Sequence, residues 1–487
     1  MSKFVRVGGV MQTVQIDSLR EFARRLDEQA NGVSEDPSPD GRALRKNMAM
    51  AYLRLARDMT LIGFSEEGLA ACRKAQLFDP ENVDVDFFYL MRLEKLNRID
   101  EAWAGMLAIE NRHKAPYAIC NKLYFLKGCL EYRRGNLDAA RHLLETFIEQ
   151  APDATALVAQ AYGLLGKILD RLGRYDRAME AFSRSNTLVA TTRVAREMLR
   201  KLDDAQSALE TSIRWYGDRS ALEPQEQYEL PCPSPVLLVG FPRSGTTLLD
   251  QILNSHSMLV TLEEKPTLKG ISDRFYGDEE KLLSLRQAGY RELSVCRQTY
   301  WTNVGSYLET NLENSVRVVD KLPLNIMHLD LYARLFPNIR IIVALRDPRD
   351  CILSNYFQTY RLTPEMAANL SLAGSAGYYS RVMSLYLLFR KMLPDNILEV
   401  HYEQVVRNFT GECARMLEFL GLEWEDSLEY YYKNARKRWI KTPSYDQVVQ
   451  PLYDDSIGRW KNYADHLREV TPVLQPFVDA FGYAAEQ

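Results

Sequence analysis

Residues 236–247, with the sequence VLLVGFPRSGTT, decide the fold of the C-terminal half of this 487-residue chain. The first five residues are a short continuous apolar run, which is typical of a buried parallel strand. From Gly240 onward the length and glycines are those of a phosphate-binding loop, and the apolar stretch 248–257 predicts a helix after it. Backbone N–H groups at the start of that helix, with the hydroxyls of Ser244, Thr246 and Thr247, are suited to bind an oxyanion. The segment predicts an α/β domain with an anion site.

The loop lacks the lysine of the ordinary nucleotide-triphosphate motif. Thr246 stands at the position where kinases and ATPases carry a lysine for the β- and γ-phosphates, and the available cation is Arg243. This disfavours triphosphate transfer. A kinase that uses the same loop is the alternative interpretation.

A second group of signals lies about a hundred residues further on. Residues 339–345 (IRIIVAL) predict another buried strand, which ends at Arg346, and Ser354 follows eight residues later on an expected helix. A guanidinium fork and a hydroxyl are well suited to hold a phosphate dianion. Arg349 and Asp350 are expected to form a local ion pair at the start of that helix.

The motif PRSGTT, together with Arg346 and Ser354, resembles the nucleotide-dependent sulfotransferases. The resemblance implies 3′-phosphoadenosine 5′-phosphosulfate as the donor, with its 5′ group on the loop and its 3′-phosphate on Arg346 and Ser354. It implies no metal. The donor-binding residues implied by the resemblance are Arg243, Ser244, Gly245, Thr246, Thr247, Arg346, Ser354, Tyr402, Ser444 and Arg459.

Within this family the chain is most similar to the tyrosylprotein sulfotransferases, through Glu263, Glu264 and Lys321. The resemblance implies that Glu264 is the general base and that Lys321 and Arg243 bind the sulfuryl group. A base is needed because a phenol of pKa about 10 is a poor nucleophile at neutral pH. His256 is the competing candidate for the base, and an ion pair between Lys321 and Asp320 is the structural alternative for the lysine.

The N-terminal half is helical in pattern and repeats one turn phrase. The second positions of this phrase are spaced by 34, 38 and 38 residues, and they are Gly63, Asn97, Gly135 and Gly173. A period of about 34 residues is that of the tetratricopeptide repeat, and Pro80 and Pro152 stand where its second helix should end. An irregular helical bundle is the alternative. Phe87, Phe88 and Tyr89 are expected to be core residues.

Four prolines between 224 and 235 mark a domain boundary, since prolines at that density continue neither a helix nor a central strand. The predicted organisation is a tetratricopeptide-like helical domain at 40–215, a proline-rich linker at 216–235, and a sulfotransferase domain at 236–485. The predicted fold class is helical repeats followed by a P-loop-like α/β domain with a parallel sheet. Two further runs, 316–319 and 397–402, are expected to be strands of that sheet.

The composition limits the partners. Lys plus Arg number 61 against 65 Asp plus Glu, a net charge of −4, which provides no overall field for nucleic acid or an anionic membrane. The first 30 residues lack the apolar core of a secretory signal, so we expect a cytoplasmic protein. The seven cysteines are scattered and are expected to be buried free thiols. The sequence leaves the oligomeric state open, a homodimer included.

The main hypothesis from the sequence is sulfuryl transfer from 3′-phosphoadenosine 5′-phosphosulfate to the tyrosine hydroxyl of a peptide or protein, which the repeats help to select. The same donor with a carbohydrate or small phenolic acceptor is the nearest alternative. A repeat scaffold whose transferase half is inactive is the other.

Overall fold

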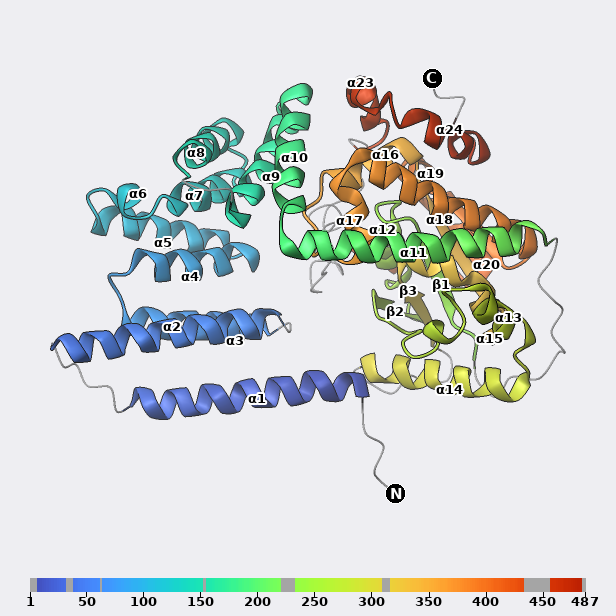
Figure 1. Ribbon diagram of the computed structural model, residues 1–487, viewed down its shortest axis with the longest axis horizontal. Coiled ribbons are helices and arrows are strands. Elements are labelled where there is room, and N and C mark those ends of the chain that lie inside the picture. The colour runs from blue at the N-terminus through green and yellow to red at the C-terminus, as the bar shows by residue number, and fades with distance from the viewer. Residues whose placement is uncertain are drawn as a thin grey trace. The chain divides into compact units, whose positions relative to one another are not determined.

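The computed structural model describes residues 7–31, 38–61, 64–151, 155–219, 233–308, 316–432 and 456–483. The chain divides into two compact units, Met1–Leu188 and Val189–Gln487. The helices that begin in the first unit are α1 (Val7–Ala30), α2 (Pro39–Leu61), α3 (Ser65–Phe78), α4 (Val83–Lys95), α5 (Ile99–Arg112), α6 (Pro116–Ile119), α7 (Lys122–Arg133), α8 (Leu137–Gln150), α9 (Ala156–Arg171) and α10 (Tyr175–Ala190) (Figure 1).

The second unit is an α/β domain preceded by one long helix. Its strands are β1 (Val236–Gly240), β2 (Leu259–Glu263), β3 (Arg317–Lys321), β4 (Arg340–Leu345) and β5 (Ile397–His401). Its α-helices are α11 (Arg193–Gly217), α12 (Thr246–Leu253), α13 (Glu279–Gln287), α14 (Tyr290–Tyr307), α15 (Leu329–Leu335), α16 (Pro348–Tyr356), α17 (Pro364–Ala367), α18 (Leu372–Met392), α19 (Tyr402–Arg407), α20 (Phe409–Leu420), α23 (Ala464–Leu467) and α24 (Thr471–Ala480). Its 3₁₀ helices are η1 (Ser272–Arg274), η2 (Pro323–His328), η3 (Ala368–Leu370), η4 (Asp426–Tyr430) and η5 (Arg459–Tyr463).

The repeat turns adopt one conformation in the three copies that the structure describes. Asn97, Gly135 and Gly173 have φ of 59°, 85° and 69°, the left-handed region that glycine and asparagine tolerate best. In each turn the next residue donates its N–H to the carbonyl five residues earlier, at 2.8–2.9 Å. This hydrogen bond closes the turn between the two helices of a repeat, which explains why the turn sequence recurs. Gly63, at the remaining turn, lies outside the described residues.

Small residues let the paired helices approach closely. A Cβ added to Gly128 would lie 3.0 Å from Leu144, and one added to Gly166 would lie 2.7 Å from the Phe182 ring. Helix α3 ends two residues before Pro80, whereas Pro152 lies outside the described residues. These contacts build the helical core by direct packing of helix on helix.

One core expectation for the repeats is wrong. Phe87 is buried and Tyr89 is partly buried, but the side chain of Phe88 is 46% exposed. Consecutive residues of a helix point about 100° apart, so three successive aromatic side chains cannot all face one core.

The sheet has five parallel strands in the order β2-β3-β1-β4-β5. The register pairs Glu263 with Lys321 and Gly240 with Ala344, so the carboxyl ends of neighbouring strands lie level. Four strands coincide with the predicted apolar runs. Strand β2, which separates α12 from Glu264, was not predicted.

Helix α12 packs on one face of this sheet. Its Leu249 and Ile252 belong to one buried cluster with Leu238 of β1 and Val319 of β3. The parallel α/β domain predicted from residues 236–247 is therefore confirmed. The same cluster fixes the helix that follows the loop, and with it the loop itself.

Helix α11, green in Figure 1, belongs to the α/β unit. The predicted domain boundary at 215 had assigned this helix to the repeats. Tyr216 donates a hydrogen bond to the buried carboxylate of Asp330, and its ring lies 5.1 Å from that of Phe389. Arg381 of α18 donates to Glu210 at 2.7 Å. Most of the predicted linker, 220–232, lies outside the described residues.

The six cysteines in the described part of the chain are buried free thiols, as predicted, and Cys232 lies outside it. Burial raises the pKa of several of these thiols, Cys72 to about 11 and Cys413 to about 12. Among the described helices, none combines the length and apolarity that a bilayer crossing requires.

We predict that Gly166→Ala destabilises the chain, because the new methyl group would overlap the buried Phe182 ring. The expected loss in free energy of unfolding is roughly 1–2 kcal/mol, which urea denaturation measures. The matched control is Gly305→Ala on α14, where nothing lies within 4 Å of the added Cβ. That change should be neutral or stabilising, because alanine favours a helix over glycine. Equal effects of the two substitutions would contradict the close packing.

Candidate functional site

The carboxyl ends of the five strands bring the candidate residues to one edge of the sheet. Gly240 ends β1, and Lys321 ends β3. Glu264, Arg346 and Tyr402 immediately follow β2, β4 and β5. Ligands of open α/β sheets bind outside the carboxyl ends of the strands, where connections leave toward opposite sides. Here the chain leaves β1 toward β2 and leaves β4 toward β5, and β1 and β4 are neighbours.

The loop after β1 has a constrained backbone. Arg243 has a φ of 71° and Gly245 a φ of 101°. A Cβ at Gly245 would lie 2.9 Å from the Tyr402 ring, so this position needs glycine for conformation and for space. Helix α12 then begins at Thr246, and its first-turn N–H groups are directed out of the helix toward this edge.

Hydrogen bonds connect the segments that carry Arg243 and Arg346 at this edge of the sheet. The Arg243 Nε donates to the Ser354 hydroxyl at 3.1 Å, and the Arg346 Nη1 donates to the Arg243 carbonyl at 3.2 Å. The Arg346 guanidinium lies 5.0 Å from the centre of the Tyr402 ring and also donates to the Ser456 carbonyl. The structure thus brings together four of the predicted donor-binding side chains.

The site fits a multiply charged anion. The hydroxyl oxygen of Ser244 and the Nε of Arg346 are buried and have no hydrogen-bond partner in the part of the chain that the structure describes. A buried donor without a partner is costly, and phosphate or sulfate oxygens of a ligand would satisfy each of the two.

Lys321 is the most buried cation of the site, with an exposed fraction of 0%. Its Nζ lies 3.2 Å from Glu264 Oε1 and 3.6 Å from Glu263 Oε1. Burial alone lowers the pKa of this ammonium, but the carboxylates of Asp250, Glu264 and Glu263 outweigh burial, and the pKa is raised. Lys321 therefore carries a positive charge at neutral pH, at the end of β3.

Asp320 does not pair with Lys321, which corrects the structural alternative. Neighbouring residues of a strand point to opposite faces, and Asp320 lies on the face away from α12. Its Oδ2 accepts hydrogen bonds from Thr267 at 2.7 Å, Tyr332 at 2.9 Å and Tyr300 at 3.0 Å. Burial raises the pKa of this carboxyl to about 6, against the opposing effect of the three hydroxyls.

His256 lies apart from the loop. It precedes β2, whereas Glu264 follows that strand, so the two candidates stand at opposite ends of β2. The His256 Nε2 is 2.9 Å from the Glu423 carbonyl, and its Nδ1 accepts the Met258 N–H at 3.1 Å. These contacts hold the ring at the amino end of the strand.

The expected pair of Arg349 and Asp350 is wrong. Arg349 instead pairs with Asp347 at 2.6 Å, and Asp347 also caps α16 through the Arg349 N–H. Asp350 accepts the backbone N–H groups of Gly458 and Trp460, both at 2.8 Å. An aspartate before a helix that begins with proline is a favourable N-cap. The capping position therefore holds the Asp347 carboxylate where it can pair with Arg349.

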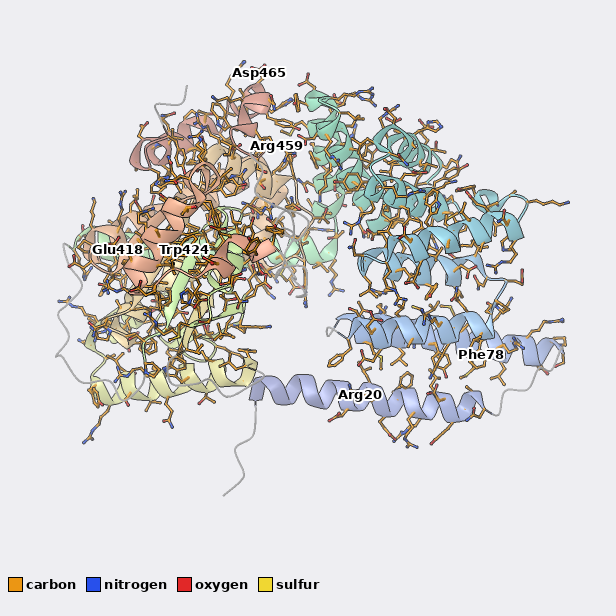
Figure 2. The ribbon with its side chains drawn as sticks, turned by 180° about the vertical axis from the view of Figure 1, so that it is seen from behind. Arg20, Phe78, Glu418, Trp424, Arg459 and Asp465 are labelled. Atoms are coloured by element: carbon orange, nitrogen blue, oxygen red, sulfur yellow. The ribbon has the colours of Figure 1, made fainter. Side chains whose placement is uncertain are left out.

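The last two predicted residues fall in the C-terminal segment. Arg459, labelled in Figure 2, lies on η5 with its guanidinium 5.1 Å from the centre of the Phe357 ring. Asp350 anchors the backbone on both sides of it. Ser444 lies outside the described residues.

Sequence reasoning missed two carboxylates of the site. Asp250 is fully buried on α12, and its position as the one charged residue in TTLLDQIL was a usable signal. Glu403 is buried beside Tyr402 and accepts the Asp347 N–H at 3.0 Å, for which the sequence offered no signal. Within the described ranges, no group of three or more His, Cys, Asp or Glu side chains has an arrangement that could hold a metal ion.

The comparisons agree with this fold. Residues 235–426 match the model of the sulfotransferase family, and residues 125–187 match that of the tetratricopeptide repeat. The chain therefore combines a domain of the sulfotransferase family with tetratricopeptide repeats, as the sequence predicted.

The similar proteins are distant. An uncharacterised protein of Aquifex aeolicus is 29% identical over 69% of this chain and 44% of its own length. Protein-tyrosine sulfotransferase A of Caenorhabditis elegans is 24% identical over 47% of this chain and 61% of its own length. The chain thus spans about half the length of these curated relatives. The sulfotransferase STF9 of Mycobacterium avium is 14% identical, with a TM-score of 0.32, over 66% of this chain and 96% of that protein.

The raised pKa of Asp320 predicts a specific dependence of stability on pH. The carboxyl has a pKa near 3.8 when unfolded and about 6 when folded, so its contribution is fully present below the lower value and is lost as pH rises through the higher one. Asp320→Asn removes this titration. Between about pH 4 and pH 7, the unfolding free energy of the wild type should fall relative to that of the variant by roughly 2–3 kcal/mol.

Chemical denaturation across this pH range measures the difference. The control is Asp138→Asn, whose carboxylate is 72% exposed, and which should follow the wild-type profile. Parallel profiles of Asp320→Asn and the wild type would contradict the assignment.

Proposed function

We propose that this protein transfers a sulfuryl group from 3′-phosphoadenosine 5′-phosphosulfate to an acceptor hydroxyl. The observation that carries the proposal is the convergence of Arg243, Lys321 and Arg346 with Glu264 at the carboxyl edge of the sheet. A metal-free phosphosulfate site needs such a set of cations, and hydroxyl activation needs a nearby base.

The 240–247 loop and the start of α12 would hold the 5′ phosphosulfate, with Ser244 donating its hydroxyl. Arg346 and Ser354 would hold the 3′-phosphate, and the Tyr402 ring supports the Arg346 guanidinium. Arg459 and Ser444 are proposed to complete the donor site from the C-terminal segment. When bound, the donor supplies an activated sulfuryl group with a good leaving group.

Glu264 is proposed as the general base and Lys321 as the cation that stabilises the charge developing on the leaving group. The Glu264 side chain is 43% exposed while one of its oxygens contacts Lys321, so an acceptor hydroxyl can reach the carboxylate. Lys321 stays charged through its three carboxylate neighbours, which suits a group that must act as a cation at neutral pH.

The acceptor is proposed to be a tyrosine of a peptide or protein. Support comes from the combination of repeats with a transferase, because repeat arrays commonly bind peptides, and from the relatives named protein-tyrosine sulfotransferase. A carbohydrate or small phenolic acceptor is the alternative within the same reaction. The cytoplasmic location stays a prediction, and the oligomeric state stays open.

We predict that Glu264→Gln lowers the turnover number by at least ~100-fold while leaving binding of adenosine 3′,5′-bisphosphate unchanged. The amide keeps the shape of the side chain but accepts no proton. Transfer of radiolabelled sulfur to a panel of peptides and phenols measures turnover, and calorimetry measures binding. His256→Gln is the control and should keep most of the activity. Loss of turnover in that control with full turnover in Glu264→Gln would reverse the assignment.

Removal of residues 1–188 tests the acceptor class. This cut keeps α11, whose Tyr216 bonds to Asp330 of the α/β unit. If the repeats select a peptide, the truncated protein should show a KM for peptide acceptors raised by tenfold or more, roughly one lost docking contact, with transfer to a small phenol retained. Unchanged kinetics with peptides would favour the small-molecule acceptor.

A further inference from the structure

Helix α16 holds the anion-binding loop at two adjacent points. The Ser354 hydroxyl accepts a hydrogen bond from the Nε of Arg243 at 3.1 Å. The next residue, Asn355, donates its Nδ2 to the backbone carbonyl of Pro242 at 2.7 Å and to the Cys351 carbonyl at 2.9 Å. The first contact involves a side chain of the loop, whereas the second holds its backbone.

Asn355 is itself oriented by a tyrosine. Its Oδ1 accepts the hydroxyl of Tyr360 at 2.7 Å, so each polar atom of the fully buried amide has a partner. Burial raises the pKa of the Tyr360 phenol, which therefore remains a hydrogen-bond donor at neutral pH. With its oxygen taken by Tyr360, the amide must present its N–H groups to the two carbonyls.

The loop segment that Asn355 holds has a strained backbone. Arg243 follows Pro242 directly and has a φ of 71°, a conformation that is unfavourable for a non-glycine residue and persists only when its surroundings impose it. The hydrogen bond from Asn355 of α16 to the Pro242 carbonyl acts on the residue directly before the strained Arg243. It keeps the peptide that precedes Arg243 in place.

We propose that Asn355 and Tyr360 are positioning residues that hold the 240–245 loop in its anion-binding conformation. Neither needs to touch the donor. The loop conformation decides where Ser244 and the backbone N–H groups point, so the pair acts on the 5′ phosphosulfate through Pro242 and Arg243. This inference rests on the proposed function, since it names the residues that prepare its donor site.

The test compares two nucleotides by calorimetry on the full chain. Asn355→Ala should weaken binding of adenosine 3′,5′-bisphosphate by about tenfold, as expected for the loss of one buried hydrogen bond. It should weaken binding of adenosine 5′-phosphosulfate, which lacks the 3′-phosphate, by the same factor. Arg346→Ala, in contrast, should weaken the bisphosphate more than the phosphosulfate.

Tyr360→Phe is the gentler variant, because it keeps the ring and removes one hydroxyl. It should weaken both nucleotides by roughly threefold, and the double variant should lose little more than Asn355→Ala alone, because the two residues act through one contact. The matched control is Tyr386→Phe, which removes a hydroxyl bonded to Glu399 at 2.5 Å and should alter thermal stability without altering nucleotide affinity.

Three results would overturn the inference. Wild-type affinity for both nucleotides in Asn355→Ala and Tyr360→Phe would show that the pair is merely structural. A loss confined to the bisphosphate would place the effect at the 3′-phosphate instead of the loop. A wild-type chain that binds neither nucleotide would reject the proposed function, and the positioning role with it.

Discussion

The parallel direction of the five strands is the constraint on which the site depends. Because each strand ends at the same edge, residues separated by up to about 160 positions, from Gly240 to Tyr402, meet without any long-range motif in the sequence. The two loops that flank the switch between β1 and β4 carry Arg243 and Arg346. Their contact, from the Arg346 guanidinium to the Arg243 carbonyl, follows directly from the pairing of the two strands.

Charge at this edge is balanced within the protein itself. Lys321 lies among the carboxylates of Asp250, Glu263 and Glu264, and the carboxylates of Asp350 and Glu403 act on Arg346. A buried ammonium is tolerated only with such partners. The near-neutral chain therefore needs no overall positive field to bind an anion, since ligand oxygens would replace protein oxygens around cations that are already in place. Selectivity then depends on geometry more than on net charge.

Strands with continuous apolar character were predictable, because both faces of a parallel sheet are covered. Strand β2 was missed because Thr261 within it and Glu263 at its end break the continuous apolar run, and its pairing with β3 makes it a strand. Likewise, α11 has the amphipathic character of the repeats, and its packing on α18 is decided by tertiary contacts such as Arg381 with Glu210. Residue types at the site were predictable from motifs. Their partners were not, since aspartates lie both two residues before Arg349 and directly after it.

Backbone strain marks the site in a way that no motif could. In the described part of the second unit, the non-glycine residues with left-handed φ are Arg243 at 71° and Glu264 at 50°, and both are proposed catalytic residues. Each is held by a bond to a neighbouring element: Asn355 fixes the carbonyl before Arg243, and the Glu264 N–H donates to the Lys321 carbonyl at 2.7 Å. Strain that is imposed in this way keeps a side chain in one orientation before its ligand arrives. With a relaxed backbone conformation, either residue would direct its charged side chain elsewhere. The backbone strain is therefore the energetic cost of holding each side chain in one direction.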